Sequence, residues 1–442
     1  MSPRVGLIAL ALRDMLRNAT RSKASLLSLC AAFVAAGVFQ GFVADATETV
    51  GANYRDLAML GEVLVEAPKQ GWAMEHQGLA QLGVEQQRVI DAFLARDPAR
   101  QRVVARFLYV QGVITVGDQS AVFVGAAHDV AEGQALRGER WAWNTPGGVP
   151  LHATEVPNPV LLGRRLGLAL GCSVPPGVDP YLADGGFKAE PRPMRCADTS
   201  ATLQGTSSDG RVTTVDATIT GIVEAGLRQL EPRVVEMPLS LGQLVLGAPL
   251  VTTYSVALAD PDDAHAFMAE LRAAAEAEGV AISARRWQDH PFFGDMYRRV
   301  AGLLQLVGRL FFVVLGLLSA MTVLNTVTRA VLERTREIGT LRALGFTDGA
   351  VLRLFALEGL LLALLASALG LLLTLLIVAG VNAAHLHYPA GFSTFPVPLR
   401  LRVVPAFYVP IAALLGVCSA AASAWPVRRV LRLSLAEALS HR

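Results

Sequence analysis

Four long apolar segments constrain this chain more than any other feature of its sequence. Each lacks a charged side chain and is long enough to cross a hydrocarbon core of roughly 30 Å as a helix. The segments are Ala24–Ala44, Leu310–Thr328, Gly359–Val381 and Val403–Val427. With 52% hydrophobic and only 17% charged residues, the composition also indicates an integral membrane protein. The predicted fold is four transmembrane α-helices with a large extracytoplasmic α+β domain between helices 1 and 2.

The distribution of Arg and Lys predicts the orientation of these segments, because positively charged flanks remain cytoplasmic. Basic residues gather before the first segment, between the second and third, and after the fourth. Arg298, Arg299 and Arg309 lie on the opposite side, and we expect the second helix to extend beyond the membrane there as a stalk. The predicted order is a cytoplasmic amphipathic helix at 1–23, transmembrane helix 1 at 24–44, the outer domain and stalk at 45–300, transmembrane helix 2 at 301–328, a cytoplasmic loop at 329–353, transmembrane helix 3 at 354–381, a short outer loop at 382–402, transmembrane helix 4 at 403–427 and a cytoplasmic tail at 428–442.

A secretory signal peptide is the competing interpretation of residues 1–44, since a basic start precedes an apolar run. The run is longer than a typical signal core. Cleavage near Ala44-Asp45-Ala46 would also leave an odd number of membrane spans. We therefore expect the first segment to remain as a transmembrane helix.

The block between the first and second segments alternates strand-like runs with turn residues. Strands are expected at Glu62–Glu66, Val103–Val116, Ala121–Gly125, Val212–Val223 and Val251–Ala259. Helices are expected at Gln86–Leu94, Val160–Leu170, Ser240–Leu246 and Asp262–Glu278. Residues 172–210, rich in Gly, Pro, Ser and Asp, are expected to form an inserted loop. These patterns predict a mixed α+β domain of two lobes.

The four cysteines fall into two groups. Cys30 and Cys418 lie inside apolar segments, where they are interpreted as small packing or lipid-facing residues. Cys172 and Cys196 lie in the outer block, where an oxidising compartment would let them form a disulfide. Two unpaired thiols are the alternative, and we favour the bridge.

Several kinds of active site lack their usual sequence signatures. A phosphate-binding loop needs Gly-Lys-Ser/Thr, but Lys23, Lys69 and Lys188 follow Ser, Pro and Phe. No His-Glu-x-x-His pattern and no Gly-x-Ser-x-Gly elbow occurs. We therefore expect no catalytic residue, metal or cofactor in this chain. A formal net charge of +2 is also too small to suggest nucleic acid binding.

Charged side chains are scarce within the predicted spans, although ion-coupled carriers need them near mid-membrane. The nearest candidate, Glu358, lies at the inner start of the third span and is interpreted as an interfacial carboxylate that pairs with Arg353 or Arg329. Energy for any transport must therefore enter from elsewhere.

A charged loop between the second and third spans suggests where this energy enters. A helix from Val331 to Leu344 would expose Glu333, Arg334, Arg336 and Glu337 on some faces and place Ile338, Leu341 and Leu344 on another, with Gly345 as its C-cap. Such a helix could dock on a soluble partner, or it could be a charged connector on the headgroups.

The loop motif Glu333-Arg334-x-x-Glu337-Ile338-Gly339-x-x-Arg342-Ala343-x-Gly345 resembles the signature of the MacB/FtsX-like permeases of ABC transporters. Arg13-Asp14-Met15-Leu16-Arg17-Asn18 resembles the helix that precedes the first span in this family. The C-terminal stretch from Pro426 to Leu439 resembles the family's ending, with Ser434 where proline is usual. The resemblance covers both ends, all four spans and the general layout of the outer domain.

The resemblance implies a dimer with a second permease copy or paralogue, joined to two copies of a cytoplasmic ABC ATPase that carries ATP and Mg²⁺. The loop would be the coupling helix that docks on the ATPase. Its implied contact residues are Glu333, Arg334, Arg336, Glu337, Ile338, Gly339, Arg342, Ala343, Leu344 and Gly345. Such permeases act as mechanotransmitters on substrates that are already in the outer leaflet or outside the membrane. The implied location is the bacterial inner membrane, with the large domain in the periplasm.

Within this family the outer domain resembles most the lipoprotein-releasing, LolC/LolE-like branch. That branch implies extraction of a lipoprotein or lipid from the outer leaflet toward a periplasmic carrier. Acyl chains would then enter between the first and second spans. The candidate contacts are Phe33, Val34, Phe39, Phe42, Leu310, Phe311, Val314 and Leu318, although ordinary lipid-facing or packing roles would also explain them.

Two other branches imply different functions. In a MacB-like system, the outer domain would bind a periplasmic adaptor for efflux of a drug, toxin or peptide. In an FtsX-like system, it would control a cell-wall hydrolase. A receptor or sensor without an ATPase is a further alternative, and it predicts that changes in the charged loop leave function intact.

Overall fold

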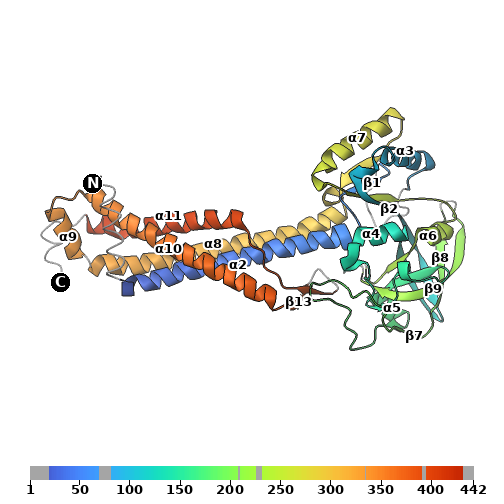
Figure 1. Cartoon of the computed structure of the whole chain (residues 1–442), viewed down its shortest axis with the longest axis horizontal. Coiled ribbons are helices and arrows are strands. Elements are labelled where there is room, and N and C mark those ends of the chain that lie inside the picture. The colour runs from blue at the N-terminus through green and yellow to red at the C-terminus, as the bar shows by residue number, and fades with distance from the viewer. Residues whose placement is uncertain are drawn as a thin grey trace. The chain divides into compact units, whose positions relative to one another are not determined.

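A computed structural model describes residues 19–68, 81–207, 210–224, 231–333, 335–390 and 395–431 of the chain. The chain divides into two compact units. The helical unit comprises Met1–Thr47, Gly302–Leu386 and Leu399–Arg442, and the α+β unit comprises Glu48–Ala301 and His387–Pro398. Most of the predicted amphipathic helix at 1–23 and residues 432–442 of the predicted tail lie outside the described residues. The two units are described separately below (Figure 1).

Within the described part of the chain, four helices are long and apolar enough to cross a membrane. They are α2 (Ala19–Ala52), α8 (Phe293–Glu333), α10 (Asp348–Ala383) and α11 (Pro405–Val430). α2 runs without a break through Ala44-Asp45-Ala46, where a signal peptidase site was considered. α8 begins at Phe293, ahead of residue 301 where the membrane segment was expected to begin. In the helical unit α10 and α11 lie side by side (Figure 1).

Glycine and small polar residues let these helices approach closely, which is the usual basis of packing between apolar helices in a membrane. A Cβ at Gly359 of α10 would lie 2.8 Å from the carbonyl oxygen of Ser419 in α11, and the Ser419 hydroxyl donates to the Gly359 carbonyl at 2.9 Å. A Cβ at Gly370 would lie 2.9 Å from the ring of Phe33 in α2. Phe33 in turn stacks on Tyr408 of α11 with ring centroids 6.0 Å apart. α2, α10 and α11 therefore share one buried core.

The outer end of the first span is fixed to the start of the fourth. Asp45 is 3.3 Å from the guanidinium of Arg402 and is largely buried. The Arg402 N–H donates to the carbonyl of Gly41 at 3.2 Å. On the other side, the Asn382 amide bonds to the backbone of Leu401 in both directions, at 3.0 and 2.9 Å. The segment before α11 is thus held by both α2 and α10.

Replacing Gly41 with alanine is expected to disrupt this junction. A Cβ there would lie 2.6 Å from the carbonyl oxygen of Arg402, which is backbone and has little freedom to move. Overpacking of this kind costs about 1–3 kcal/mol, and thermal unfolding in detergent would measure it. Gly302→Ala is the matched control, because a Cβ at Gly302 meets nothing within 4 Å. Equal melting temperatures for the two variants would contradict the expectation.

The first lobe of the α+β unit is a closed ring of strands. The long strand β2 (Gln101–Val116) pairs with β3 (Gln119–His128), and the ring continues through β10 (Val234–Pro238), β5 (Pro159–Gly163), β9 (Val212–Val223) and β8 (Ser200–Thr206), which returns to β2. A short strand, β4 (Gly147–Gly148), extends the sheet beside β9. The interior is filled by apolar side chains such as Val110, Phe123 and Val235. Helix α6 (Leu239–Leu246) packs on β2, β3, β8 and β9, and its Val245 is fully buried.

The second lobe shares strand β2 with the first. The first half of β2 pairs with β11 (Thr253–Leu258), followed by β1 (Val63–Glu66) and β12 (Ser283–Arg286). Helices α3 (Val84–Leu94) and α7 (Ala264–Ala277) pack together on this sheet around a separate apolar core. One strand thus belongs to both lobes and joins them.

Two sequence-based expectations for this unit were wrong. The helix expected at Val160–Leu170 is a strand, β5, followed by the short helix α5 (Arg164–Ala169). A short apolar run does not distinguish a buried strand from a helix, and here β5 is buried between β9 and β10. The loop expected at 172–210 contains β8, whose polar face is solvent-exposed. Helix α4 (Val130–Trp141) and strand β10 were not anticipated.

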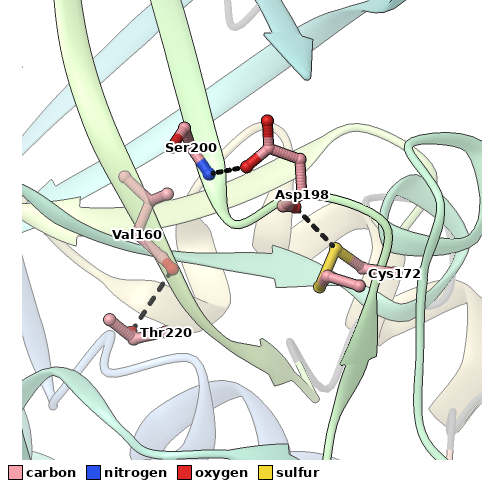
Figure 2. The surroundings of a disulfide bond; sticks show 6 residues. Val160, Cys172, Asp198, Ser200 and Thr220 are labelled. Atoms are coloured by element: carbon pink, nitrogen blue, oxygen red, sulfur yellow. Dashed lines mark hydrogen bonds between the residues drawn. A yellow bond between two sulfur atoms is a disulfide. The ribbon is translucent and has the colours of Figure 1, made fainter. Parts of the chain in front are cut away.

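Cys172 and Cys196 form a disulfide between the paired strands β6 (Cys172–Ser173) and β7 (Arg195–Cys196). Figure 2 shows it beside Asp198, whose side chain accepts the Ser200 N–H at 2.8 Å. The bond closes a segment that carries Tyr181 and Phe187. Both rings pack on Phe395, with centroids 6.1 and 5.9 Å apart, in the loop between the third and fourth spans. That loop forms the hairpin of β13 (His387–Pro389) and β14 (Pro396–Pro398).

Removing the disulfide by the double change Cys172→Ser and Cys196→Ser is expected to destabilise this segment. A cross-link that closes a loop of 24 residues stabilises a fold by about 3 kcal/mol in the chain-entropy model. Proteolysis of the full chain would then cut within 173–195 faster than in the wild type. The double change Cys30→Ser and Cys418→Ser, at free cysteines, is the control. Equal cleavage rates would show that the aromatic contacts hold the segment without the bond.

Candidate functional site

The charged loop forms a short helix of its own between the second and third spans. α8 continues to Glu333, and α9 follows at Thr335–Ala343. The single helix expected from Val331 to Leu344 therefore differs from the structure, because its first three residues belong to the helix of the second span. Arg334 and the side chains of Glu333, Arg336, Glu337 and Leu341 lie outside the described residues.

One buried side chain anchors α9 to the helical unit. Ile338 is only 1% exposed. It packs in an apolar cluster with Val351 and Phe355 of α10 and with Val427 and Val430 of α11. A Leu or Ile truncated to Ala in such a core costs about 2–5 kcal/mol. α9 is therefore packed against the ends of α10 and α11 that lie beside the loop.

The end of α9 is a tight turn into α10. The Leu344 N–H donates to the Thr340 carbonyl at 3.0 Å, and the Gly345 N–H donates to the Arg342 carbonyl at 3.0 Å. Gly345 has a φ of +92°, a conformation that glycine adopts at helix C-termini without strain. Thr347 then caps α10 by accepting the Ala350 N–H. Arg342 lies 3.1 Å from Asp348 and ties the two sides of the turn together.

This turn presents apolar side chains to the surroundings of the chain. Leu344 is 72% exposed and Phe346 is 40% exposed. The sequence placed Leu344 on the same face as Ile338, but Leu344 follows the last helical residue and points away from the buried cluster. Ala343 and Gly345 are exposed beside it, whereas Gly339 is buried. Residues 343–346 therefore form an exposed apolar turn, which we name the 343–346 turn.

Sequence reasoning found the loop but missed part of what positions it. Val427 and Val430 in the C-terminal helix, and the capping residue Thr347, were not proposed as parts of the site. The threonine carried a usable signal, since Thr-Asp before an apolar helical run is typical of a helix N-terminus. Nothing local in the sequence indicates that residues 427–430 lie beside residue 338.

The eight candidate acyl-chain residues do not form one surface. Phe33 is 1% exposed and belongs to the core with α10 and α11. Phe39 stacks on Phe311 with centroids 4.3 Å apart, which joins α2 to α8. Val34 and Phe42 are half-buried. The exposed members are Leu310, Val314 and Leu318 of α8.

α8 carries a longer apolar stripe of which these three residues are a part. Leu303, Leu310 and Leu317, at seven-residue spacing, are 62–63% exposed. Leu306, Val307, Val313 and Met321 are exposed on the same side. A stripe at this period is the pattern of a helix that packs along another helix.

Comparison with known proteins finds a family match for part of the chain. Residues 309–435 match the family model described as FtsX-like permease C-terminal. No curated protein sequence matches the chain. The matched region contains most of α8, all of α9 and α10, and α11.

Two solved structures are similar to about half of the chain at low identity. One is the extracellular domain of the noncanonic ABC-type transporter YknZ from Gram-positive bacteria, at 9% identity and a TM-score of 0.31, covering 51% of this chain and 98% of that one. The other is the periplasmic region of MacB from Actinobacillus actinomycetemcomitans, at 10% identity and a TM-score of 0.30, covering 52% of this chain and 90% of that one. Scores this low establish nothing about substrate or partner. The family match is confined to residues 309–435, which are similar to an FtsX-like permease C-terminal region and include the exposed turn between their first two long helices.

Proposed function

We propose that this chain is the permease subunit of an ABC transporter whose ATP hydrolysis takes place on a separate cytoplasmic ATPase. The observation that carries the proposal is α9 with the 343–346 turn, a short helix between two spans inside the region that matches the permease family. Ile338 anchors α9 to the helical unit, whereas Leu344 and Phe346 in the turn are exposed. An element that is rigidly held on one side and apolar on the other is suited to dock in a groove of a partner.

The apolar stripe of α8 supports a second permease copy or a paralogue as a further partner. Leucines at a seven-residue period have the spacing by which one helix can pack along another. The complex would then contain two permease chains and two ATPase chains. Closure of the ATPases would move α9, and through Ile338 the inner ends of α10 and α11.

For the substrate, we propose a lipoprotein or lipid taken from the outer leaflet of a bacterial inner membrane and passed to a periplasmic carrier. The apolar stripe of α8 supports this, because its exposed side chains are leucine, valine and methionine. A hydrophilic solute crossing beside α8 would need polar partners there. The large α+β unit would then lie in the periplasm, where it could receive the carrier.

Purification of the chain from its native membrane in mild detergent, with mass spectrometry of what stays bound, tests this function. Recovery of an ATPase together with a lipoprotein or phospholipid would support it. An ATPase with a periplasmic adaptor would favour efflux instead, and an ATPase with a cell-wall hydrolase would favour regulation of that enzyme. A complex without any ATPase would contradict the transporter assignment.

A further inference from the structure

An apolar cavity of about 190 Å³, open to the surroundings of the chain on one side, lies among the first, second and fourth spans. Its walls come from α2, α8 and α11 and include Ala32, Ala36, Phe312, Gly316, Phe407 and Leu414. The rings of Phe312 and Phe407 lie 5.0 Å apart on one side of it. None of the eight residues proposed above as acyl-chain contacts lines this cavity.

Small residues create the space. Ala32 and Ala36 are one helical turn apart in α2, so they leave adjacent gaps on the same face of the helix. Across the cavity, a Cβ added at Gly316 would meet nothing within 4 Å. Larger side chains at these three positions would fill the cavity.

The depth of the cavity limits what can occupy it. The ion pair of Asp45 with Arg402 marks the polar boundary on the side of the large domain, because paired charges are unstable in hydrocarbon. Ala36 and Ala32 lie about 14 and 20 Å from that boundary, along a helix that rises 1.5 Å per residue. They therefore lie near the middle of a hydrocarbon core of roughly 30 Å.

Neither water nor vacuum is a favourable occupant at this depth. A buried water needs two to four polar partners, and the side chains named above offer none. An empty space leaves the lining atoms without dispersion contacts on one side. Apolar cavities of roughly 150 Å³ take up apolar molecules such as benzene. The only abundant material of that chemistry inside a membrane is the aliphatic chain of a lipid.

We propose that this cavity is a binding site for the end of an acyl chain from the leaflet beside the large domain. Its role as a substrate site rests on the proposed function. One wall of the cavity comes from α8. The other two come from α2 and α11, which share a buried core with α10. A shift of these helices against α8 would change its volume and release or admit the chain.

Photolabelling of the full chain in lipid nanodiscs tests this site. Two probes would be used in parallel, a phospholipid and a diacylated cysteine lipopeptide, each with a diazirine at the end of an acyl chain. Adducts mapped by mass spectrometry are expected to concentrate on Phe312 and Phe407 with at least one probe. The probe that labels more strongly identifies the source of the chain.

Gly316→Leu is expected to reduce these adducts to the level found at the lipid-facing residues Leu372 and Leu376. Gly380→Leu is the matched control, because Gly380 is equally open but lies on α10 away from the cavity. Leu414→Trp fills the cavity from another helix and should act as Gly316→Leu does. Labelling of the cavity no stronger than at Leu372 and Leu376 would overturn the proposal, as would labelling that neither filling variant reduces.

This measurement is independent of any ATPase. If the chain binds no ATPase, the transporter function fails while the labelling result stands. If the ATPase binds and the cavity is not labelled, the site fails while the proposed function stands.

Discussion

Leu344→Asp is expected to weaken ATPase binding about thirtyfold or more without unfolding the permease. The side chain is 72% exposed, so the substitution removes no internal packing. In a docked complex it would place a carboxylate in an apolar contact, and removal of a central contact of this kind typically costs about 2 kcal/mol or more. This corresponds to roughly a thirtyfold weaker affinity. Co-purification and titration with the ATPase recovered in the native complex would measure the loss.

Two control variants separate docking from folding. Leu344→Met keeps the size and apolar character of the side chain, and we expect near-normal binding. Ile338→Ala instead truncates the buried anchor, so it should lower the melting temperature of the chain as well as ATPase binding. Equal affinity for the Leu344→Asp and Leu344→Met variants would show that the 343–346 turn does not contact the ATPase.

Arg137→Met is expected to produce the largest loss of stability in the α+β unit. Its guanidinium lies 2.6 Å from a carboxylate oxygen of Glu236 and also donates to the carbonyl of Leu57 at 3.1 Å. The two charged side chains are 6% and 4% exposed. Removing Arg137 takes the guanidinium away from buried Glu236, although His128 remains 3.8 Å from its carboxylate. Loss of one member of a buried pair costs about 3–5 kcal/mol. Thermal unfolding of the full chain in detergent, followed by near-ultraviolet circular dichroism, would measure this loss.

The control for this prediction is an exposed pair in the same unit. Arg88 lies 3.2 Å from Glu278, and both side chains are at least half exposed, so solvent and salt screen the pair. We expect little change in the melting temperature for Arg88→Met. A similar change for both variants would show that Arg137 is not needed to compensate Glu236.

The ion pair of Arg137 with Glu236 also predicts that the stability of the fold depends on pH. Burial is the largest single influence and raises the pKa of Glu236, but Arg137 and His128 together outweigh it and hold the pKa at about 2, below the ordinary 4.5. A carboxylate whose pKa is lower in the folded state than in the unfolded state stabilises the fold fully at pH values above its ordinary pKa. This stabilisation is lost as the pH falls from 4.5 toward 2. The double variant Arg137→Met, Glu236→Gln should show a flatter pH dependence in that range. An unchanged slope would assign the acid sensitivity to other carboxylates.

The long periodic features were accessible from the sequence because their signal is local. An apolar run without charge predicts a membrane helix whatever it packs against, and four such helices are present. Strand β9 begins and ends at Val212 and Val223, where alternating residues predicted a strand. Helix α6 differs by one residue from the expected Ser240–Leu246.

The predictions for short segments were wrong because the signal that decides their structure is not local. Residues 160–163 form a strand only because β9 and β10 supply hydrogen-bonding partners on both sides. β8 has a polar face, so its composition resembled a loop until it closed the ring between β2 and β9. In both cases the decisive partners are distant in the sequence, and local propensity was overridden by tertiary pairing.

The candidate site shows the same division. The sequence by itself determined that a charged amphipathic stretch lies between two spans and that Gly345 can end a helix there. Only the tertiary structure decided which side of that helix is available, because Ile338 is buried by residues of α10 and α11 that lie up to 92 positions later, whereas Leu344 leaves the helix and is exposed. The cavity between α2, α8 and α11 is likewise invisible in the sequence. Alanine and glycine in an apolar run leave space only where three helices converge, and that convergence is a property of the packed chain.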